Sequence, residues 1–183
     1  LETGYEKRFE QYDVFMDRPP PLVPRYLRLT VTERIAADGT VLTPLDESAL
    51  VSMIPTLKAE NVEAVAVGFL HSYVNAAHEQ RARDLLAEHL PGVAITTSAE
   101  VSPEIREYDR FSTACANAYV QPLMAGYLGR LSTAMKTQGF SGALLLMMSG
   151  GGLTTLETAR RLPIRLVESG PAGGAILATG IAA

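Results

Sequence analysis

The sequence predicts an α/β fold in which mixed or parallel sheets are flanked by helices. Near-continuous apolar runs at 62–70 and 93–97 enclose a helical pattern, which is the plan of a β-α-β unit. Two further apolar runs, 143–148 and 164–167, each break into a glycine cluster. The first two runs are therefore expected to be parallel strands of one sheet, joined by a crossover that is right-handed in almost every case.

The chain divides into four predicted regions. Residues 1–25 are polar and then Pro-rich, so they are expected to form an extended lead-in. Residues 26–103 form an α/β region that contains the β-α-β unit. Residues 104–138 form a long linking helix, which Pro122 should kink or split. Residues 139–183 begin a glycine-rich region that we expect to be truncated.

The first α/β region opens with a predicted hairpin. Residues 26–35 alternate apolar and polar side chains, as in a half-buried strand. Asp38-Gly39 supplies the turn, and residues 40–42 return as the partner. Asp46 is a predicted N-cap for a helix that runs to about Glu60. A second helix is expected to start near Asn75 and to end at Pro91-Gly92.

Residues 98–103 are expected to form a loop, followed by a helix that starts at Pro103 and Glu104. The charged residues of its first turns, including Arg106 and Arg110, are interpreted as a solvated face or a cap network, with a paired-carboxylate acid/base site at Glu104 and Glu107 as the alternative. Thr154 and Glu157 predict a capping box for a short helix after the first glycine cluster. The last helix is expected to begin at Ala175.

The two glycine clusters are the first candidate site. Each is predicted to join a strand to a helix, where glycine permits close approach of a ligand and the free N–H groups of the helix start favour an anion. Such turns are common in α/β domains, and neither cluster matches the dinucleotide fingerprint or the P-loop. The predicted nucleotide-contacting residues are Ser149, Gly150, Gly151, Gly152, Ser169, Gly170, Ala172, Gly173 and Gly174.

A second group of candidates follows the strand at 62–70. His71, His78 and Glu79 lie at its predicted carboxyl end, where open α/β sheets usually bind ligands. His71 is the candidate for substrate contact, and His78 and Glu79 are the candidates for a metal. The spacing does not match a helical zinc site, and Glu79 is also favoured near a helix start by the helix dipole alone.

Several motifs in the same order resemble the hydantoinase A/5-oxoprolinase family, which includes subunits of acetone and acetophenone carboxylases. They are Phe69-Leu70-His71-Ser72-Tyr73, His78-Glu79, the stretch 102–110 and both glycine clusters. The resemblance runs from about Tyr12 to the C-terminus. One departure is visible: the family usually reads Gln-Ser-Asn-Gly-Gly where this chain has Met148-Ser149-Gly150-Gly151-Gly152.

The resemblance implies an actin/hexokinase-like ATPase fold that binds ATP with Mg. The implied function is ATP-dependent opening of a cyclic amide or imide such as a hydantoin, 5-oxoproline or a similar lactam. The alternatives are ATP-dependent carboxylation of a ketone such as acetone or acetophenone, and a non-catalytic assembly module. The implied partners are a hydantoinase B-type subunit or fused domain and a second copy in a homo-oligomer.

The two Asp-x-Gly phosphate loops of that fold are not found in the sequence. We therefore expect an internal piece of a longer subunit, inactive in isolation.

Composition excludes several other classes. The 183 residues are 47% hydrophobic and carry a net charge of −4 with no basic run, which argues against nucleic-acid binding. No apolar run reaches the roughly 18 residues that a membrane helix needs, and the start of the sequence lacks the order of a signal peptide. A single cysteine, Cys115, lies in an apolar helical stretch and is interpreted as a core residue. These features predict a cytoplasmic protein.

Overall fold

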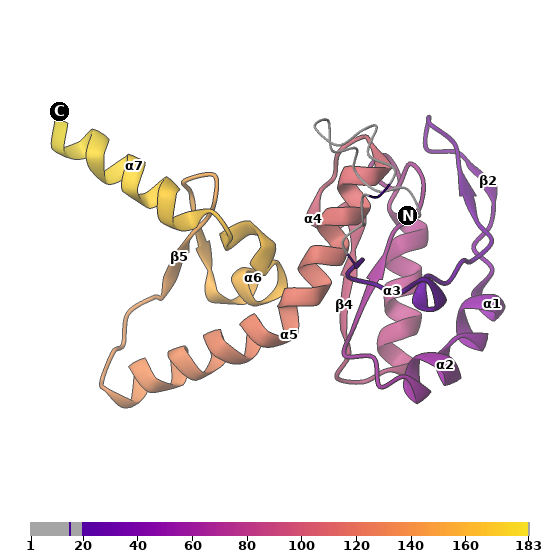
Figure 1. Ribbon diagram of the computed structural model, residues 1–183, viewed down its shortest axis with the longest axis horizontal. Coiled ribbons are helices and arrows are strands. Elements are labelled where there is room, and N and C mark those ends of the chain that lie inside the picture. The colour runs from indigo at the N-terminus through magenta and orange to yellow at the C-terminus, as the bar shows by residue number, and fades with distance from the viewer. Residues whose placement is uncertain (1–14, 16–19, 183) are drawn as a thin grey trace.

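The computed structural model describes residue 15 and residues 20–182. Most of the predicted lead-in lies outside the described residues, apart from a 3-10 turn η1 (Arg25–Leu27) near its end. Helix α5 (Glu107–Thr137) joins two groups of elements. In Figure 1 the strands β3 and β4 lie on one side of it, and β5, α6 and α7 lie on the other.

The predicted β-α-β unit is confirmed. Strand β3 (Ala64–Val67) pairs in parallel with β4 (Ala94–Thr97), with Val65 opposite Ile95, and α3 (Ala77–His89) is the crossover. Because side chains alternate along a strand, one face of this pair carries Val65, Val67 and Ile95. That face packs against the main core, whose buried members are Leu50, Ile54, Leu57, Val67, Ala82, Leu85, Leu86 and Leu90.

Helix α5 covers the opposite face of the β3–β4 pair. Its buried side chains there are small or polar: Ala114, Asn117 and Ala118. Small side chains allow the helix to lie close to the strands, and Asn117 donates from Nδ2 to the Thr96 hydroxyl at 3.0 Å. Pro122 lies inside α5 and does not split it, and the helix changes direction along its length in Figure 1.

The predicted hairpin forms, but it is shorter than expected. Strand β1 (Arg34–Ile35) pairs antiparallel with β2 (Val41–Thr43), and Gly39 takes a φ of 87° in the turn. The strand predicted over residues 26–35 is wrong for most of its length, because β2 is too short to give the earlier residues a partner. Tyr26 instead lies in η1 and donates its hydroxyl to Glu60.

The helix predicted from Asp46 to Glu60 is divided in two. Asp46 caps α1 (Glu47–Ser52) as expected, since its Oδ1 accepts from the Ala49 N–H at 2.9 Å. A second helix, α2 (Ile54–Ala59), follows after Met53. The break lies just before Pro55, which has no N–H to continue the first helix. The sequence carried this signal, and the prediction missed it.

The segment predicted as a loop at 98–103 begins with a helical turn, α4 (Ser98–Val101). Its first turn is stabilised by a residue of another helix: the carboxylate of Glu79 in α3 accepts from the Ser98 hydroxyl and from the Ala99 N–H. The next helix, α5, starts at Glu107 and not at Pro103. The Glu104 carbonyl is bound instead by the side chain of Arg110, and Arg106 has a left-handed φ of 78° that does not fit a helix.

The glycine-rich region also differs from its prediction. Strand β5 (Leu145–Met147) pairs antiparallel with β6 (Leu153–Thr155), so the first glycine cluster is a hairpin turn and not a strand-to-helix turn. The predicted capping box is displaced by one residue, because Thr154 pairs within β6. Thr155 caps α6 (Leu156–Arg161) by accepting from the Thr158 N–H.

The strand predicted at 164–167 is a 3-10 helix, η2 (Pro163–Leu166). Its backbone forms no strand ladder: the Ile164 N–H donates to the Asn117 side chain, and the Arg165 carbonyl accepts from both the N–H and the hydroxyl of Ser149. The final helix, α7 (Ser169–Ala182), starts six residues before the predicted Ala175. The second glycine cluster therefore forms the first turns of α7.

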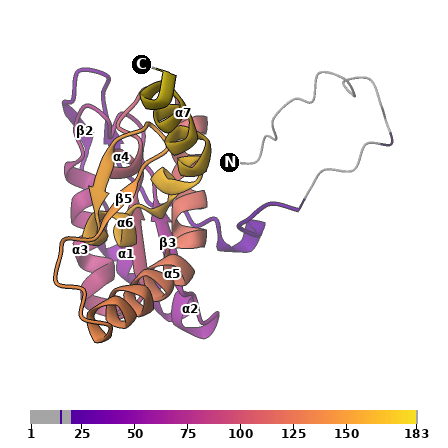
Figure 2. The ribbon, with the colours of Figure 1, turned by 90° about the vertical axis from the view of Figure 1, so that its left-hand side faces the viewer.

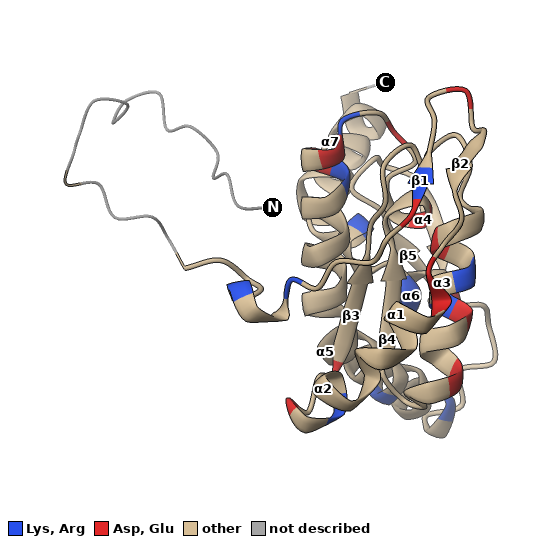
Figure 3. Cartoon of the chain, turned by 90° about the vertical axis from the view of Figure 1, so that its right-hand side faces the viewer, with Lys and Arg blue, Asp and Glu red and all other residues tan. Residues whose placement is uncertain are grey.

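No helix in the described part of the chain is both long and apolar enough to cross a membrane. In Figure 3 the basic and acidic residues of the described chain are spread along the ribbon in short separate segments. This distribution agrees with the net charge of −4.

The close approach of β3 to α5 gives a first prediction. A Cβ added to Gly68 would lie 2.6 Å from Cδ1 of Phe111, which is too close for two carbon atoms. We expect Gly68→Ala to lower the free energy of unfolding by about 1–3 kcal/mol, as for an overpacked core. Urea denaturation followed by circular dichroism measures this loss. Gly180→Ala in α7, where a Cβ meets nothing within 4 Å, is the control and should show no loss.

Candidate functional site

The loop after β3, residues 68–75, is fixed at both backbone polar groups of one residue, Phe69. The Phe69 N–H donates to Oε1 of Glu79 at 2.8 Å, and the Phe69 carbonyl accepts from Nη2 of Arg110 at 2.8 Å. We call residues 68–75 the edge loop. It lies at the carboxyl ends of β3 and β4, the edge at which open α/β sheets usually bind ligands.

Glu79 and Arg110 are joined by the hydroxyl of Ser98. This hydroxyl donates to Oε1 of Glu79 at 2.6 Å and accepts from Nε of Arg110 at 3.0 Å. All three side chains are 0% exposed. Burial of charged groups is costly unless they are paired and hydrogen-bonded, and every buried side-chain N and O among the described residues has a partner.

Arg110 also fixes the segment before α5 and contacts two aromatic rings. Its Nη1 donates to the Glu104 carbonyl at 2.9 Å. Its guanidinium carbon lies 5.5 Å from the ring centroid of Tyr73 and 5.2 Å from that of Phe111, within cation–π range. The prediction of a solvated Arg110 is therefore wrong. Charge spacing alone gave no signal for it, because the partners of Arg110 lie up to 41 residues away.

His71 lies in the middle of the edge loop with an unusual backbone. Its φ is 57°, a left-handed value that non-glycine residues seldom adopt. Its Nδ1 lies 2.8 Å from the carbonyl oxygen of Ile35 in β1. A carbonyl only accepts hydrogen bonds, so Nδ1 carries the proton. Asn75, at the end of the loop, donates from Nδ2 to the Gly39 carbonyl at 2.8 Å.

The two predicted metal candidates have other partners. Glu79 accepts three hydrogen bonds from Phe69, Ser98 and Ala99. Nδ1 of His78 lies 2.8 Å from Oε2 of Glu33, and both side chains are nearly buried. Within residues 20–182 and Phe15, no group of three or more His, Cys, Asp or Glu side chains is placed to hold a metal ion.

The two glycine clusters meet at Ser149. Its N–H and its hydroxyl both donate to the Arg165 carbonyl, at 2.7 and 2.8 Å, and the hydroxyl accepts from the Glu168 N–H at 3.1 Å. Glu168 directly precedes α7. Ser149 therefore fixes the start of α7 against the hairpin turn that contains Gly150, Gly151 and Gly152.

Close packing between the turn and α7 requires small residues. Gly151 has a φ of 82°, and a Cβ there would lie 3.2 Å from Cδ1 of Ile176 in α7. A Cβ on Gly173 would lie 3.9 Å from Met147 of β5. Figure 2 shows α7 and β5 on the same side of the molecule. The two glycine clusters therefore lie side by side, although neither is a strand-to-helix loop.

Helix α4 connects the edge loop to the glycine clusters. Its amino end is bound to Glu79 and Arg110 through Ser98, as described above. At its carboxyl end, the Glu100 and Val101 carbonyls accept from Nη2 of Arg165 at 3.3 and 3.4 Å. Four residues of α-helix span only about 6 Å, so the two candidate sites share one supporting element.

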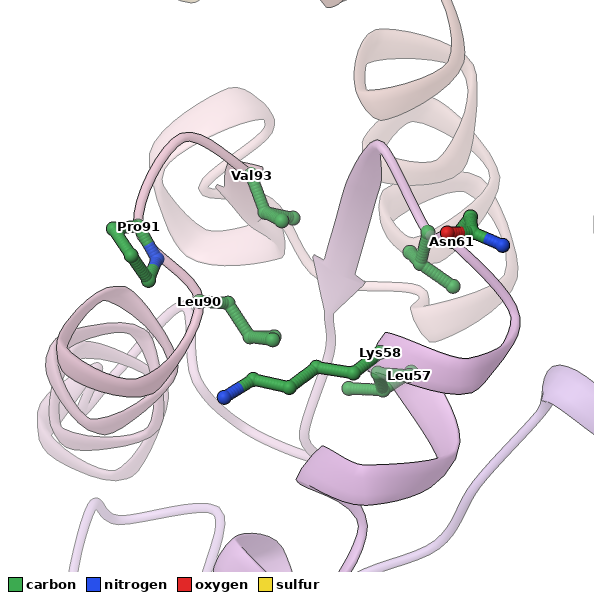
Figure 4. A pocket seen from close by; sticks show the side chains of 7 residues that line it. Leu57, Lys58, Asn61, Leu90, Pro91 and Val93 are labelled. Atoms are coloured by element: carbon green, nitrogen blue, oxygen red, sulfur yellow. The ribbon is translucent and has the colours of Figure 1, made fainter.

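Two surface depressions lie away from these groups. One, of 330 Å³, is lined mainly by apolar residues and by Lys58 and Asn61 (Figure 4). It lies where the chain enters β3 and β4, at the end of the sheet opposite the edge loop. The other, of 390 Å³, lies between α5 and α6 and is lined by Gln121, Ala125, Leu156, Glu157, Arg160 and Arg161.

Cys115 is partly buried in α5. Burial raises the pKa of its thiol, which lowers the thiolate fraction at neutral pH. The interpretation of Cys115 as a packing residue agrees with this environment.

Removal of Arg110 should be strongly destabilising. In Arg110→Met the carbonyls of Phe69 and Glu104 lose their donor, and Glu79 loses the buried positive charge nearest to it. We expect the free energy of unfolding to fall by about 3–5 kcal/mol, as when one member of a buried charged pair is removed. Denaturant unfolding measures the loss. Arg81→Met, which breaks the exposed pair with Glu47, is the matched control and should leave the unfolding midpoint nearly unchanged. An equal effect of the two variants would contradict the role assigned to Arg110.

Comparison with known proteins gives consistent matches over nearly the whole chain. Residues 1–90 match the hydantoinase/oxoprolinase N-terminal region, and residues 110–183 match hydantoinase/oxoprolinase. An uncharacterized protein of Methanocaldococcus jannaschii is 40% identical, over 96% of this chain and 26% of that protein.

Two solved structures are also similar. The ATP-dependent caprolactamase from Pseudomonas jessenii aligns with a TM-score of 0.83 and 36% identity, over 92% of this chain and 24% of that one. A nucleotide-free acetone carboxylase structure, described under the mechanism of ATP-dependent acetone carboxylation, aligns with a TM-score of 0.79 and 31% identity, over 90% and 24%. The chain thus spans about a quarter of the length of the relatives that it matches.

Proposed function

The chain belongs to the hydantoinase/oxoprolinase family, and on that premise we propose that it is part of an ATP-dependent enzyme that opens a cyclic amide. The substrate class is a lactam or imide, such as caprolactam, 5-oxoproline or a hydantoin. The observation that supports this most is the 36% identity and matched fold shared with the ATP-dependent caprolactamase. We further propose that the full polypeptide has an actin/hexokinase-like nucleotide fold and works with a B-type subunit or fused domain.

The nucleotide is assigned to the glycine clusters. The residues proposed to contact it are Ser149, the Gly150–Gly152 turn and the start of α7 from Ser169 to Gly174. The first N–H groups of a helix lack partners within the helix and attract anions, and α7 is 14 residues long. Pro171 has no N–H to contribute, and the Ala172 N–H already donates to the Glu168 carbonyl at 3.3 Å, so Ser169 and Gly170 are the residues of this first turn that would offer theirs. N–H donors of this kind fit a phosphate group.

ATP supplies an activating group for an otherwise unreactive amide. Transfer of its γ-phosphoryl group to the amide oxygen gives an imidate that water attacks readily. The protein then acts mainly by positioning the reactants and by stabilising charge. His71, which lies at the carboxyl edge of β3 and β4, is proposed to contact the cyclic amide.

Ketone carboxylation is the second candidate, since the acetone carboxylase structure also matches nearly the whole chain. An assay of the full-length polypeptide, together with any partner subunit, separates the two. We expect ADP release to be stimulated by caprolactam, 5-oxoproline or hydantoin. Stimulation by acetone and bicarbonate alone would assign the carboxylase reaction instead.

The nucleotide assignment predicts the effect of a bulky side chain in α7. Gly173→Val should raise the dissociation constant for ADP about tenfold or more, because the branched side chain occupies space next to β5 where a phosphate would approach. A tenfold change corresponds to about 1.4 kcal/mol. Isothermal titration of the full-length polypeptide measures it. Gly180→Val, in the same helix but with open space around it, is the control. Unchanged ADP affinity in a folded Gly173→Val protein would refute the assignment.

A further inference from the structure

The proposed function assigns His71 a contact with the substrate. The tautomer of its imidazole ring specifies what kind of hydrogen bond this contact is. Nδ1 donates to the Ile35 carbonyl at 2.8 Å, so in the neutral imidazole the lone pair is on Nε2. Nε2 forms no hydrogen bond within the part of the chain that the structure describes. His71 therefore presents an acceptor, and the side chain is only partly buried.

The orientation of this acceptor is fixed by four contacts to the edge loop. The N–H of Phe69 is bound by Glu79 and its carbonyl by Arg110. His71 is bound to Ile35, and Asn75 is bound to Gly39. The loop holds His71 in a left-handed conformation that costs energy, at φ 57°. A strained residue persists only when its surroundings determine its position, and such residues gather at ligand sites.

We propose that Nε2 of His71 accepts a hydrogen bond from the ring N–H of the cyclic amide and so selects substrates that carry this N–H. The inference rests on the proposed function, because it requires a lactam or imide as the substrate. It assigns a specificity-determining role to His71, and it makes Ile35 the group that sets its tautomer. Neither a ketone nor an N-substituted lactam offers this hydrogen.

The same contact favours the activation step. The amide nitrogen and oxygen share electrons by resonance, so a base that accepts the N–H makes the oxygen a better nucleophile. The bond from the γ-phosphorus to ADP breaks as the bond to the amide oxygen forms, and the N–H proton passes to Nε2. Nδ1–H continues to donate to the Ile35 carbonyl, so the resulting imidazolium remains hydrogen-bonded.

The position of the edge loop is compatible with a nucleotide at the glycine clusters. Helix α4 is bound to the edge-loop anchors through Ser98 at one end and to Arg165 at the other. The carbonyl of the same Arg165 holds Ser149. The edge loop and the glycine clusters are therefore both connected to the short helix α4.

The test compares a lactam with its N-methyl derivative in the full-length polypeptide, with any partner subunit. The probes are caprolactam and N-methylcaprolactam, and in parallel 5-oxoproline and N-methyl-5-oxoproline. The measured quantity is the ratio of kcat/KM for the N–H and N-methyl forms, from ADP release. We expect the wild-type protein to favour the N–H form by about fivefold or more, as for one hydrogen bond worth roughly 1 kcal/mol.

Two substitutions separate the contribution of the Nε2 acceptor from the other contacts of His71. His71→Asn keeps a group that reaches Ile35 and tolerates the left-handed backbone, but it has no acceptor at the reach of Nε2. The ratio should fall towards one. His71→Gln places an amide oxygen near the position of Nε2 and should restore part of the preference. Both variants should bind ADP as the wild type does, and His89→Asn, at the end of α3, should leave the ratio unchanged.

An unchanged N–H preference in His71→Asn, with lactam-dependent ADP release intact, would overturn the role of His71 and leave the proposed function in place. Equal activity of wild-type protein on the N–H and N-methyl forms would overturn it as well. Absence of ADP release with every lactam, while acetone and bicarbonate stimulate it, would instead overturn the proposed function together with this inference.

Discussion

The arrangement of the edge loop, α4 and the start of α5 depends on one buried guanidinium. Arg110 is 0% exposed and donates to Ser98 and to the Phe69 and Glu104 carbonyls, while Glu79 carries the compensating charge. A charge in this position is tolerated only because each donor has a partner. The edge loop, α4 and the segment before α5 are thereby fixed to one side chain, and the strained backbone of His71 follows Phe69 by two residues.

The regular parts of the fold were predictable because the sequence encodes them locally. The apolar runs around 62–70 and 93–97, together with the helix between them, identified the parallel pair and its crossover. Asp38-Gly39 identified the hairpin turn, and Asp46 identified the helix cap. The incorrect predictions lie where contacts with residues distant in the sequence determine the backbone conformation. Glu79 stabilises the helical turn α4 in a segment that was predicted to be a loop. Ser149 and Asn117 stabilise the 3-10 helix η2 in a segment where an apolar run predicted a strand.

The candidate site was likewise predictable only where the signal is local in the sequence. Glycine composition located the two clusters, and the polar residues after β3 located His71. Composition did not show that the first cluster is a hairpin turn or that the second lies inside α7, since a short apolar run does not reveal its partner strand. Arg110 and Ser98 were not identified as structural centres. Their importance comes from contacts across 12 to 41 residues, which no local pattern contains.

The central claim is that the glycine clusters bind the nucleotide and the edge loop binds the cyclic amide. Hydrogen–deuterium exchange on the full-length polypeptide tests it most directly, with ADP alone, caprolactam alone and both together. The account predicts that ADP slows exchange at residues 149–152 and 168–174, and that the lactam slows exchange at residues 69–75. Protection by ADP elsewhere in the polypeptide, with these segments unchanged, would contradict it.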